Sequence, residues 1–517
     1  MANSQARSKD IKTTGLVQKT ESLALLSVLL LAVFLRLFRL GYQSLWIDEI
    51  NAVLMAGKSI FKIIFAGDTT PPFIYLVNHL WQKLGTSDSM VRFPAAIFGV
   101  LSVYAAYKLA KALLGKKEAF LTAFIISISL YHIIYSQEAA RPYTAFIFFS
   151  LISLYCLCQI LNTNRNKYWA GFIIFNVFNL YTQLFAIFVL TSEIIIWLVF
   201  IFQRAIRKKG NYKSVINSML KFGLGIIGII VLSLPVSIQF ISAAESELTP
   251  GRVVLNPIYY KNLLCRYGAG NGLQLFIYNF FFISGLISLF RGDKRKETGL
   301  LIFWLVFPFF LLSFMELKHF FHIRYVIFTY PAYIIIVSKG ITNFLNSKYI
   351  LPRKNALTAV ILIIFASLSY LPLKLYYQMP ARLTDWRGAA RYIYDNAKDG
   401  AMVITNGVHD TLIKYYLEKE TMQKKMQVIS HDNILQNFRN LLLYNNDEVY
   451  YVGYGEDVGY GTDIFSLLAE EHFKNKEVFF SPVYAELGKR ELIDWDGNSW
   501  VDVGVRGYRL VVYFNKN

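Results

Sequence analysis

The sequence predicts a polytopic α-helical membrane protein that carries a C-terminal extracytoplasmic α/β domain. The chain has 517 residues, of which 55% are hydrophobic, and its mean hydropathy is +0.40. Soluble proteins are about 45–50% apolar. Here the apolar excess is gathered into blocks of roughly 20 residues, the length with which a helix crosses a bilayer. From about residue 380 onward, helical and strand-like patterns alternate instead.

About eleven apolar segments have the length and composition expected of spans, although the third and fifth are short. They lie at 22–40, 93–114, 119–135, 142–161, 168–182, 184–202, 217–241, 273–290, 298–315, 326–344 and 356–374. We therefore expect a membrane module over residues 1–375, with long outer loops at 41–92 and 242–272. Amphipathic pieces near 58–66 and 73–84 predict interfacial helices in the first loop.

The net charge of +19 does not indicate a nucleic-acid-binding protein, because the basic residues gather in alternate loops. Lys116 and Lys117 mark one such loop, and residues 204–209 mark another. Loops of this kind are typically cytoplasmic. The sequence thus predicts a multi-pass protein of the inner (plasma) membrane, with a cytoplasmic N-terminus and an outer C-terminal domain. The first apolar segment lacks a small-residue cleavage site and is expected to be a retained span.

Residues 380–517 are expected to form the soluble extracytoplasmic α/β domain. A helical pattern covers 385–397, and strand-like runs lie at 401–405, 426–430, 448–454, 477–485 and 508–514. No glycine-rich phosphate-binding motif opens a helix there, so no nucleotide is assigned. The three cysteines of the whole chain are too few for a disulfide framework.

Two adjacent carboxylates, Asp48 and Glu49, follow the first span. Charged side chains at a membrane boundary are costly and often functional. One interpretation is a general base or metal ligand at the outer surface. The alternative is a helix N-cap followed by a favourable acid in the first turn.

Other outer loops supply further candidates. Glu138 is a second carboxylate that could face the same cavity, although it could also simply pair with Arg141 on a helical turn. Arg324 suits a bidentate phosphate contact, and Arg266 is a weaker candidate for the same role. His319 and His322 are spaced for a metal, but we favour interfacial packing for them.

Acidic and basic outer loops on one face of a membrane bundle suit a lipid donor whose phosphate lies at the interface. A polyprenyl-phosphate sugar meets this requirement. Its transfer needs a base to take a proton from the acceptor hydroxyl. It also needs a cation to stabilise the departing phosphate.

Seven short sequence pieces occur in the order found in one known family. They are residues 45–49 (LWIDE), 67–72 (GDTTPP), 91–94 (VRFP), 135–138 (YSQE), 141–143 (RPY), 324–325 (RY) and 385–390 (DWRGAA). The chain resembles polytopic glycosyltransferases of the GT-C fold. More closely, it is similar to the family 39-like bacterial branch related to protein O-mannosyltransferases and to the lipid A aminoarabinose transferase.

This resemblance implies an inverting transfer of a sugar from a polyprenyl-phosphate-linked donor. It places Asp48 above Glu49 as the catalytic residue, either alone as base or through a cation, and makes Glu138 a second acidic position. The expected phosphate-binding residues are Arg324, Arg141 and Arg266. The expected substrate-binding residues are Trp46, Asp68, Tyr143 and Tyr325.

Two departures from the family pattern bear on the cofactor and on one arginine. Thr70 stands where the family often has histidine, so a divalent metal ion is left open as a cofactor. Ala139 and Ala140 precede Arg141 where relatives commonly have one residue, which leaves the alignment of Arg141 open. The expected partners are the polyprenyl-phosphate sugar donor, a lipid, glycan or protein acceptor, and membrane lipids, with no nucleic acid.

Two other functions compete with sugar transfer. A transporter or flippase of a lipid-linked glycan would place charged residues near mid-span and show broken helices in paired halves. The acidic candidates instead lie at outer span ends, and the sequence shows no paired halves. A non-catalytic assembly partner that docks through residues 380–517 is the third interpretation.

Overall fold

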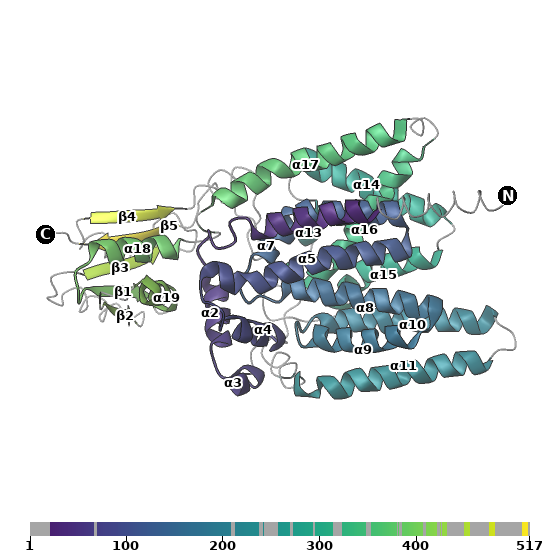
Figure 1. Cartoon of the computed structure of the whole chain (residues 1–517), viewed down its shortest axis with the longest axis horizontal. Coiled ribbons are helices and arrows are strands. Elements are labelled where there is room, and N and C mark those ends of the chain that lie inside the picture. The colour runs from purple at the N-terminus through teal and green to yellow at the C-terminus, as the bar shows by residue number, and fades with distance from the viewer. Residues whose placement is uncertain are drawn as a thin grey trace, which may run out of the picture.

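The computed structural model has a bundle of long helices at one side and a small sheet at the other (Figure 1). It describes residues 21–66, 70–207, 212–236, 241, 257–268, 272–292, 295–313, 323–347, 353–379, 381, 385–406, 410–420, 424, 426–431, 449–454, 475–480 and 509–514. Three short helices lie between bundle and sheet: α2 (Ile47–Ala56), α3 (Ile60–Ile64) and α4 (Phe73–Trp81).

The bundle begins with a helix at residues 21–37 and continues through helices that follow the apolar segments. These are α5 (Asp88–Leu113), α6 (Lys116–Ile128), α7 (Leu130–Ser136), α8 (Tyr143–Thr163), α9 (Asn166–Leu180), α10 (Ala186–Arg207), α11 (Tyr212–Ser233), η1 (Leu234–Val236), α13 (Pro257–Tyr267), α14 (Leu273–Arg291), α15 (Arg295–Leu312), η2 (Ile323–Thr329), α16 (Tyr330–Leu345) and α17 (Lys354–Gln378). The predicted interfacial pieces correspond to α3 and α4, whereas α2 lies in the predicted first loop, where a helix start at Asp48 was one of two interpretations.

Among the described residues, seven helices are long and apolar enough to cross a membrane, or up to eight if a bent pair counts as one span. The bent pair is α6 and α7, which meet at 62°. A count of eleven is therefore not reached by length and composition. The helix at 21–37 and α9, with 15 residues, are shorter than the 18 residues required of a span, and α15 carries three charged residues in its first turn.

Two glycines allow α14 and α16 to pack closely. A Cβ added at Gly285 would lie 2.0 Å from the carbonyl oxygen of Ile336, and one at Gly340 would lie 1.8 Å from that of Phe281. Small residues that let helix backbones approach are typical of membrane bundles. Either substitution would therefore force these two helices apart.

The bundle also buries charged and polar side chains. Glu193 is fully buried in α10 and accepts hydrogen bonds from Ser153 Oγ at 2.7 Å and Asn176 Nδ2 at 2.8 Å. Arg36 is likewise fully buried and donates to His132 Nδ1 at 2.8 Å. Buried polar groups need such partners, so these bonds join α10 to α8 and to α9, and the first helix to α7.

The two ends of the bundle differ in what they carry. At one end, Glu21 pairs with Lys111 and with Lys116, where the first predicted cytoplasmic loop begins. At the other end, Gln43 Nε2 donates to the Tyr376 carbonyl oxygen at 2.8 Å, close to where the chain enters the sheet region. The C-terminal sheet therefore lies at the end of the bundle opposite residue 21.

The C-terminal sheet has five strands in the order β2-β1-β3-β5-β4. They are β1 (Met402–Asn406), β2 (Gln427–His431), β3 (Val449–Tyr454), β4 (Asn475–Phe480) and β5 (Arg509–Phe514), with helices α18 (Trp386–Asn396) and α19 (Asp410–Glu420). The strand β1 pairs in parallel with β2 and β3, whereas β5 pairs antiparallel with β3 and β4. These elements start and end near the predicted helix and strands.

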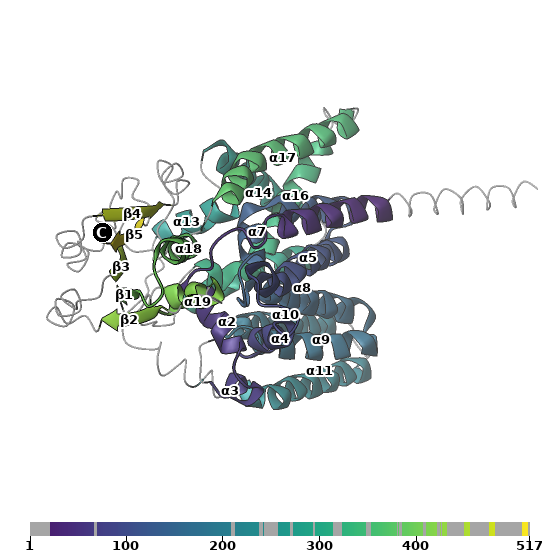
Figure 2. The ribbon, with the colours of Figure 1, turned by 60° about the vertical axis from the view of Figure 1, so that its left-hand side comes forward.

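The two C-terminal helices share a hydrophobic core with α2. Leu45 and Ile50 are fully buried in one cluster with Trp386 of α18 and Ile413 of α19. Figures 1 and 2 show α19 beside α2 from two directions. The start of α2 is thus covered by residues more than 300 positions later in the chain.

Candidate functional site

The helix α2 begins at Ile47 and carries Asp48 and Glu49 in its first turn. Trp46 is its N-cap residue, and the Trp46 N–H donates to Glu49 Oε2 at 3.3 Å, as in a capping box. The two carboxylates lie in different surroundings: the Glu49 side chain is 1% exposed, and that of Asp48 is 30% exposed. Neither is the N-cap residue, but both are acids in the first turn of a helix, so that part of the alternative applies to Asp48 as well as to Glu49.

Glu49 is occupied by structural contacts. Its Oε1 accepts from Arg92 Nε at 2.9 Å, and its Oε2 accepts from Arg92 Nη2 at 2.7 Å. Oε1 also accepts the Ala139 N–H at 2.6 Å. One carboxylate therefore ties together α2, α5 and the loop after α7, deep in the protein.

Asp48 instead meets two arginines from different parts of the chain. Its Oδ2 lies 3.2 Å from Arg141 Nη2 and 3.6 Å from Arg324 Nη2. Burial alone would lower the pKa of Arg141, but Tyr143 and Asp48 beside it raise that pKa above its usual value. The guanidinium stays charged at any physiological pH. Two cations and a partly exposed carboxylate thus meet at the loop that follows the first helix.

Aromatic rings surround the guanidinium of Arg324. Its Cζ lies 5.7 Å from the ring centre of Trp46, 5.9 Å from that of Tyr143 and 5.7 Å from that of Tyr325. Tyr325 is itself stacked on Phe185 at 5.0 Å. Rings at these distances attract a cation through their π faces. They also fix the orientation of Arg324, which is buried.

The backbone just before Arg141 has an unusual conformation. Ala140 has φ +51°, in the left-handed region that a residue with a Cβ rarely adopts. Beyond it, Arg141 reaches Asp48 and donates to Tyr143 Oη at 3.0 Å. Strained backbone of this kind costs about 1–3 kcal/mol and tends to occur at functional sites. Arg141 therefore contacts Asp48 directly after this left-handed residue.

The other predicted residues are placed less directly. Glu138 is buried in the loop after α7, next to the residue that binds Glu49. Arg266 lies in the last turn of α13, which reaches η2 because the neighbouring Tyr267 Oη donates to the Val326 carbonyl oxygen at 3.0 Å. Asp68, His319 and His322 lie outside the described residues.

Metal binding was left open by the sequence. In the described ranges, no group of three or more His, Cys, Asp or Glu side chains is arranged to hold a metal ion. Thr70, which stands where the family often has histidine, lies just before α4.

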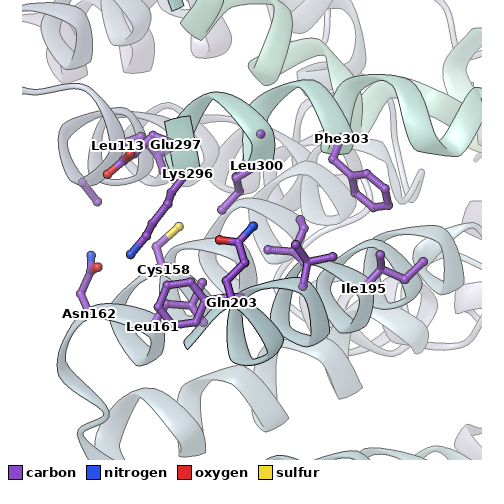
Figure 3. Close-up of a pocket in the computed structure, with 15 residues that line it drawn as sticks. Leu113, Cys158, Leu161, Asn162, Ile195, Gln203, Lys296, Glu297, Leu300 and Phe303 are labelled. Atoms are coloured by element: carbon purple, nitrogen blue, oxygen red, sulfur yellow. The ribbon is translucent and has the colours of Figure 1, made fainter. Parts of the chain in front are cut away.

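One cavity of about 280 Å³ lies elsewhere in the bundle, lined by side chains of α5, α8, α10 and α15 (Figure 3). Lys296, Glu297, Gln203 and Asn162 supply its polar groups. Asn162 is near the opposite end of α8 from Tyr143, about 30 Å away at 1.5 Å per residue. This cavity is therefore not the surroundings of Asp48.

Sequence reasoning missed several residues that build the site. Arg92, Arg387 and Trp386 occur in quoted motif pieces, but no role was assigned to them. Arg387 pairs with Asp88, which also accepts from Lys419 Nζ at 2.7 Å. A basic residue within an otherwise apolar segment, such as Arg92 near the start of α5, was the available signal.

Comparisons with known proteins agree with this architecture. The family model described as dolichyl-phosphate-mannose-protein mannosyltransferase matches residues 69–233. This range includes Glu138, Arg141 and Tyr143 but neither Asp48 nor Arg324. An uncharacterized protein of Aquifex aeolicus is 25% identical over 371 residues, which are 69% of this chain and 71% of that protein.

Solved structures match over most of the chain. ArnT from Cupriavidus metallidurans in the apo state is 12% identical, with a TM-score of 0.58 over 97% of this chain and 98% of that one. The apo oligosaccharyltransferase of Archaeoglobus fulgidus is 14% identical, with a TM-score of 0.51 over 84% and 69%. The chain has the GT-C fold. Its long apolar helices make it a multi-pass membrane protein, and residues 69–233 resemble the O-mannosyltransferase family model.

The GT-C fold gives the cluster at Asp48 its context. In this chain the fold joins the first outer loop, the loop after α7 and the start of η2 at one end of the bundle. Asp48, Arg141 and Arg324 come from these three segments. This cluster is therefore at the end of the bundle away from the cavity of Figure 3.

Proposed function

We propose that this protein transfers a sugar from a polyprenyl-phosphate donor to a lipid, glycan or protein acceptor at the outer face of the cytoplasmic membrane, with inversion. The observation that carries the proposal is the convergence of Arg141 and Arg324 on Asp48, at 3.2 and 3.6 Å. A carboxylate beside two largely buried guanidinium groups provides both a base and an anion-binding site.

Asp48 is the proposed general base. It takes the proton of the acceptor hydroxyl, whose oxygen forms a bond to the anomeric carbon of the sugar. The bond between that carbon and the donor phosphate oxygen breaks on the opposite face, so the configuration inverts. The electron pair leaves with the polyprenyl phosphate. A positioned base of this kind contributes about 10²–10⁴-fold to the rate.

Arg141 and Arg324 are the proposed ligands of the donor phosphate. A guanidinium donates two parallel hydrogen bonds to a phosphate and stabilises its charge as it departs. In the donor-free protein, Asp48 is the counter-ion for both arginines. The phosphate would replace it in that role, which would leave the carboxylate available to the acceptor hydroxyl.

The comparisons support this choice of donor. A second structure of ArnT from Cupriavidus metallidurans is bound to undecaprenyl phosphate, and it matches 95% of this chain with a TM-score of 0.55 at 12% identity. The family model over residues 69–233 names a dolichyl-phosphate donor. Both are lipid phosphates, so a polyprenyl-phosphate-linked sugar is the donor class that we carry to this chain.

The remaining predicted residues take supporting roles in this proposal. Trp46, Tyr143 and Tyr325 hold the guanidinium of Arg324 and border the sugar site. Glu49 anchors α2 through Arg92 rather than reacting, because its oxygens are taken by buried hydrogen bonds. Glu138 would shape the loop that presents Arg141. Arg266 and Asp68 stay candidates for phosphate and sugar contact, respectively.

The test is transfer from defined donors in membranes that contain the protein. Undecaprenyl phosphate carrying tritiated mannose, glucose or aminoarabinose is supplied separately, and label in lipid, glycan and protein fractions is counted. We expect one donor to label one fraction. Asp48→Asn should lower the rate at least about 100-fold while undecaprenyl phosphate still binds. Full turnover by Asp48→Asn would exclude Asp48 as the base.

The flippase alternative has one observation in its favour, the intramembrane carboxyl of Glu193. However, both its oxygens accept hydrogen bonds from side chains of neighbouring helices, and it is fully buried. Such bonds suit a role in helix packing. Reconstituted vesicles distinguish the two functions, since movement of labelled donor across the bilayer without a new glycosidic product would favour the flippase.

A further inference from the structure

The backbone just before α2 is held by residues from two distant parts of the chain. We call residues 42–45 the entry segment, because it leads from the first helix into the turn that carries Asp48. On one side is Arg92 of α5, whose Nη1 donates to the Gln43 carbonyl oxygen at 2.7 Å and whose Nη2 donates to that of Ser44 at 3.3 Å. This side of the entry segment belongs to the bundle.

The other side of the entry segment belongs to α18. Arg387 donates through its guanidinium to the carbonyl oxygens of Tyr42 and Gln43, both at 3.0 Å. Its backbone N–H donates to Ser44 Oγ at 3.2 Å. Ser44 also forms a parallel β-bridge with Ala381. Residues near the start of the C-terminal sheet region therefore contact both the backbone and a side chain of the entry segment.

The last contact before α2 comes from α19. The Leu45 N–H donates to Tyr416 Oη at 2.6 Å, and Tyr416 Oη in turn donates to Asp88 Oδ2 at 2.9 Å. Asp88 is also paired with Arg387 and Lys419. A single buried hydroxyl thus connects the entry segment to an ion-pair group shared by α5, α18 and α19.

The position of Asp48 depends on where α2 begins. Leu45 precedes the N-cap residue Trp46, and Asp48 is in the first turn that follows. Leu45 and Ile50 are buried against α18 and α19 in one cluster, so the helix is also packed on that side. A displacement of about 1 Å at a reacting group can cost 10²-fold in rate. Small shifts of the entry segment would therefore be felt at the carboxylate.

We propose that Tyr416, carried by the C-terminal helices, is a positioning residue for Asp48. This inference rests on the proposed function, in which Asp48 is the base. In this role the C-terminal helices affect the reaction by holding the backbone before α2, and they do not contact the substrate. Tyr416 touches neither donor nor acceptor in this role.

The test compares Tyr416→Phe with Tyr415→Phe as its matched control. Tyr415 is the neighbouring residue on α19, and its hydroxyl accepts from Lys419 Nζ at 2.9 Å rather than touching the entry segment. Both variants keep the aromatic ring. Phe at position 416 leaves the Leu45 N–H without its acceptor, and a buried donor left so is costly.

Two measurements are made on the full-length protein in membranes or detergent. The first is amide hydrogen exchange of a peptide covering residues 42–49, which should become about tenfold faster in Tyr416→Phe and stay unchanged in Tyr415→Phe. The second is transfer from the labelled undecaprenyl-phosphate sugar, where kcat should fall about tenfold and the donor KM should stay within twofold. Unchanged exchange in Tyr416→Phe would overturn the proposal whether or not the protein transfers sugar.

A disulfide provides a rescue that a general loss of stability would not show. Ser44→Cys and Ala381→Cys, added to Tyr416→Phe, would pair two bridge partners whose Cα atoms lie about 5 Å apart. Oxidation should restore at least half of the lost kcat and slow the exchange, and a reductant should reverse both. Faster exchange with an undiminished kcat, or oxidation without any recovery, would overturn the positioning role. Absence of transfer by the wild-type protein from every donor would contradict only the proposed function, since the exchange measurement by itself decides whether Tyr416 anchors the entry segment.

Discussion

Glu49 and Arg92 are joined at two points inside the protein, with Oε1 2.9 Å from Nε and Oε2 2.7 Å from Nη2. Their side chains are 1% and 4% exposed. Asp48, one residue earlier, is partly open to solvent and contacts two other arginines. These two carboxylates are neighbours in the sequence but differ in their environment. Mutation can therefore separate their roles.

Glu49→Gln should chiefly reduce stability. It leaves the buried charge of Arg92 without its counter-ion, and breaking such a pair costs about 3–5 kcal/mol. We expect a fall of several degrees in the detergent melting temperature. Glu418→Gln is the control, because Glu418 is exposed and only weakly paired with Lys414. Equal melting temperatures for the two variants would contradict a structural role for Glu49.

Arg324→Lys should weaken donor binding although it keeps the positive charge. Lysine lacks the planar group that pairs bidentately with phosphate and stacks between aromatic rings. We expect the KM for the undecaprenyl-phosphate sugar to rise about tenfold. Arg39→Lys is the matched control, since Arg39 is exposed at the same end of the bundle and stacks on Tyr42 at 3.4 Å. An unchanged KM in Arg324→Lys would remove this residue from the phosphate site.

Asp385 should make the C-terminal helices sensitive to pH. It caps α18 by accepting the Gly388 N–H at 2.9 Å. Burial raises its pKa above the usual 3.8, against the opposing effects of that hydrogen bond and of Arg387. A raised folded-state pKa contributes stability that is fully present below the unfolded pKa and is lost as pH rises through the folded value.

Asp385→Asn should therefore flatten the melting temperature between pH 4 and pH 8 while keeping the cap. The variant should equal the wild type at the acid end and exceed it at neutral pH, because the amide carries no charge to bury. Melting curves at fixed ionic strength give the comparison. A wild-type melting temperature that rises with pH across this window, relative to the variant, would have the opposite sign and refute the assignment.

The predicted orientation can be tested with single cysteines, since the three native cysteines are buried. Asn396→Cys lies on α18 at the end of the bundle with the sheet, and Lys117→Cys lies at the other end; both positions are exposed. An impermeant maleimide should label Asn396→Cys in intact cells and Lys117→Cys only after permeabilisation. The reverse pattern would place Asp48 on the cytoplasmic side.

The positions of the bundle helices could be predicted because apolar runs near 20 residues are a strong local signal. The strands β1 and β5 and the helix α18 were also near their predicted places, since their periodicity is local. The helix α2 was predicted only as the alternative reading of Asp48 and Glu49, a helix start without bounds. Its ten residues are too few for a span, and half of them are buried by partners that the local sequence does not reveal.

The candidate site was predicted in part, for a different reason. Arg141 and Arg324 were named from their residue types, loops and family resemblance, and the structure brings both to Asp48. The contact between Asp88 and Arg387 joins residues 299 positions apart and leaves no periodic trace in the sequence. Averaged hydropathy likewise hides a lone buried charge such as Glu193. Which carboxylate is structural and which is open was therefore beyond the sequence.

The entry segment has a consequence for how the protein is made. The Leu45 N–H donates a hydrogen bond to Tyr416, which lies 371 residues later in the chain. Synthesis proceeds from the N-terminus at about 5–20 residues per second, and Tyr416 follows the last bundle helix. Every bundle helix has therefore been synthesised before this hydrogen bond can form. A nascent or truncated chain would hold Asp48 without its last anchor. The protein would then become able to carry out the proposed transfer only late in its biogenesis, after the final quarter of the chain has packed against the loop that follows the first helix.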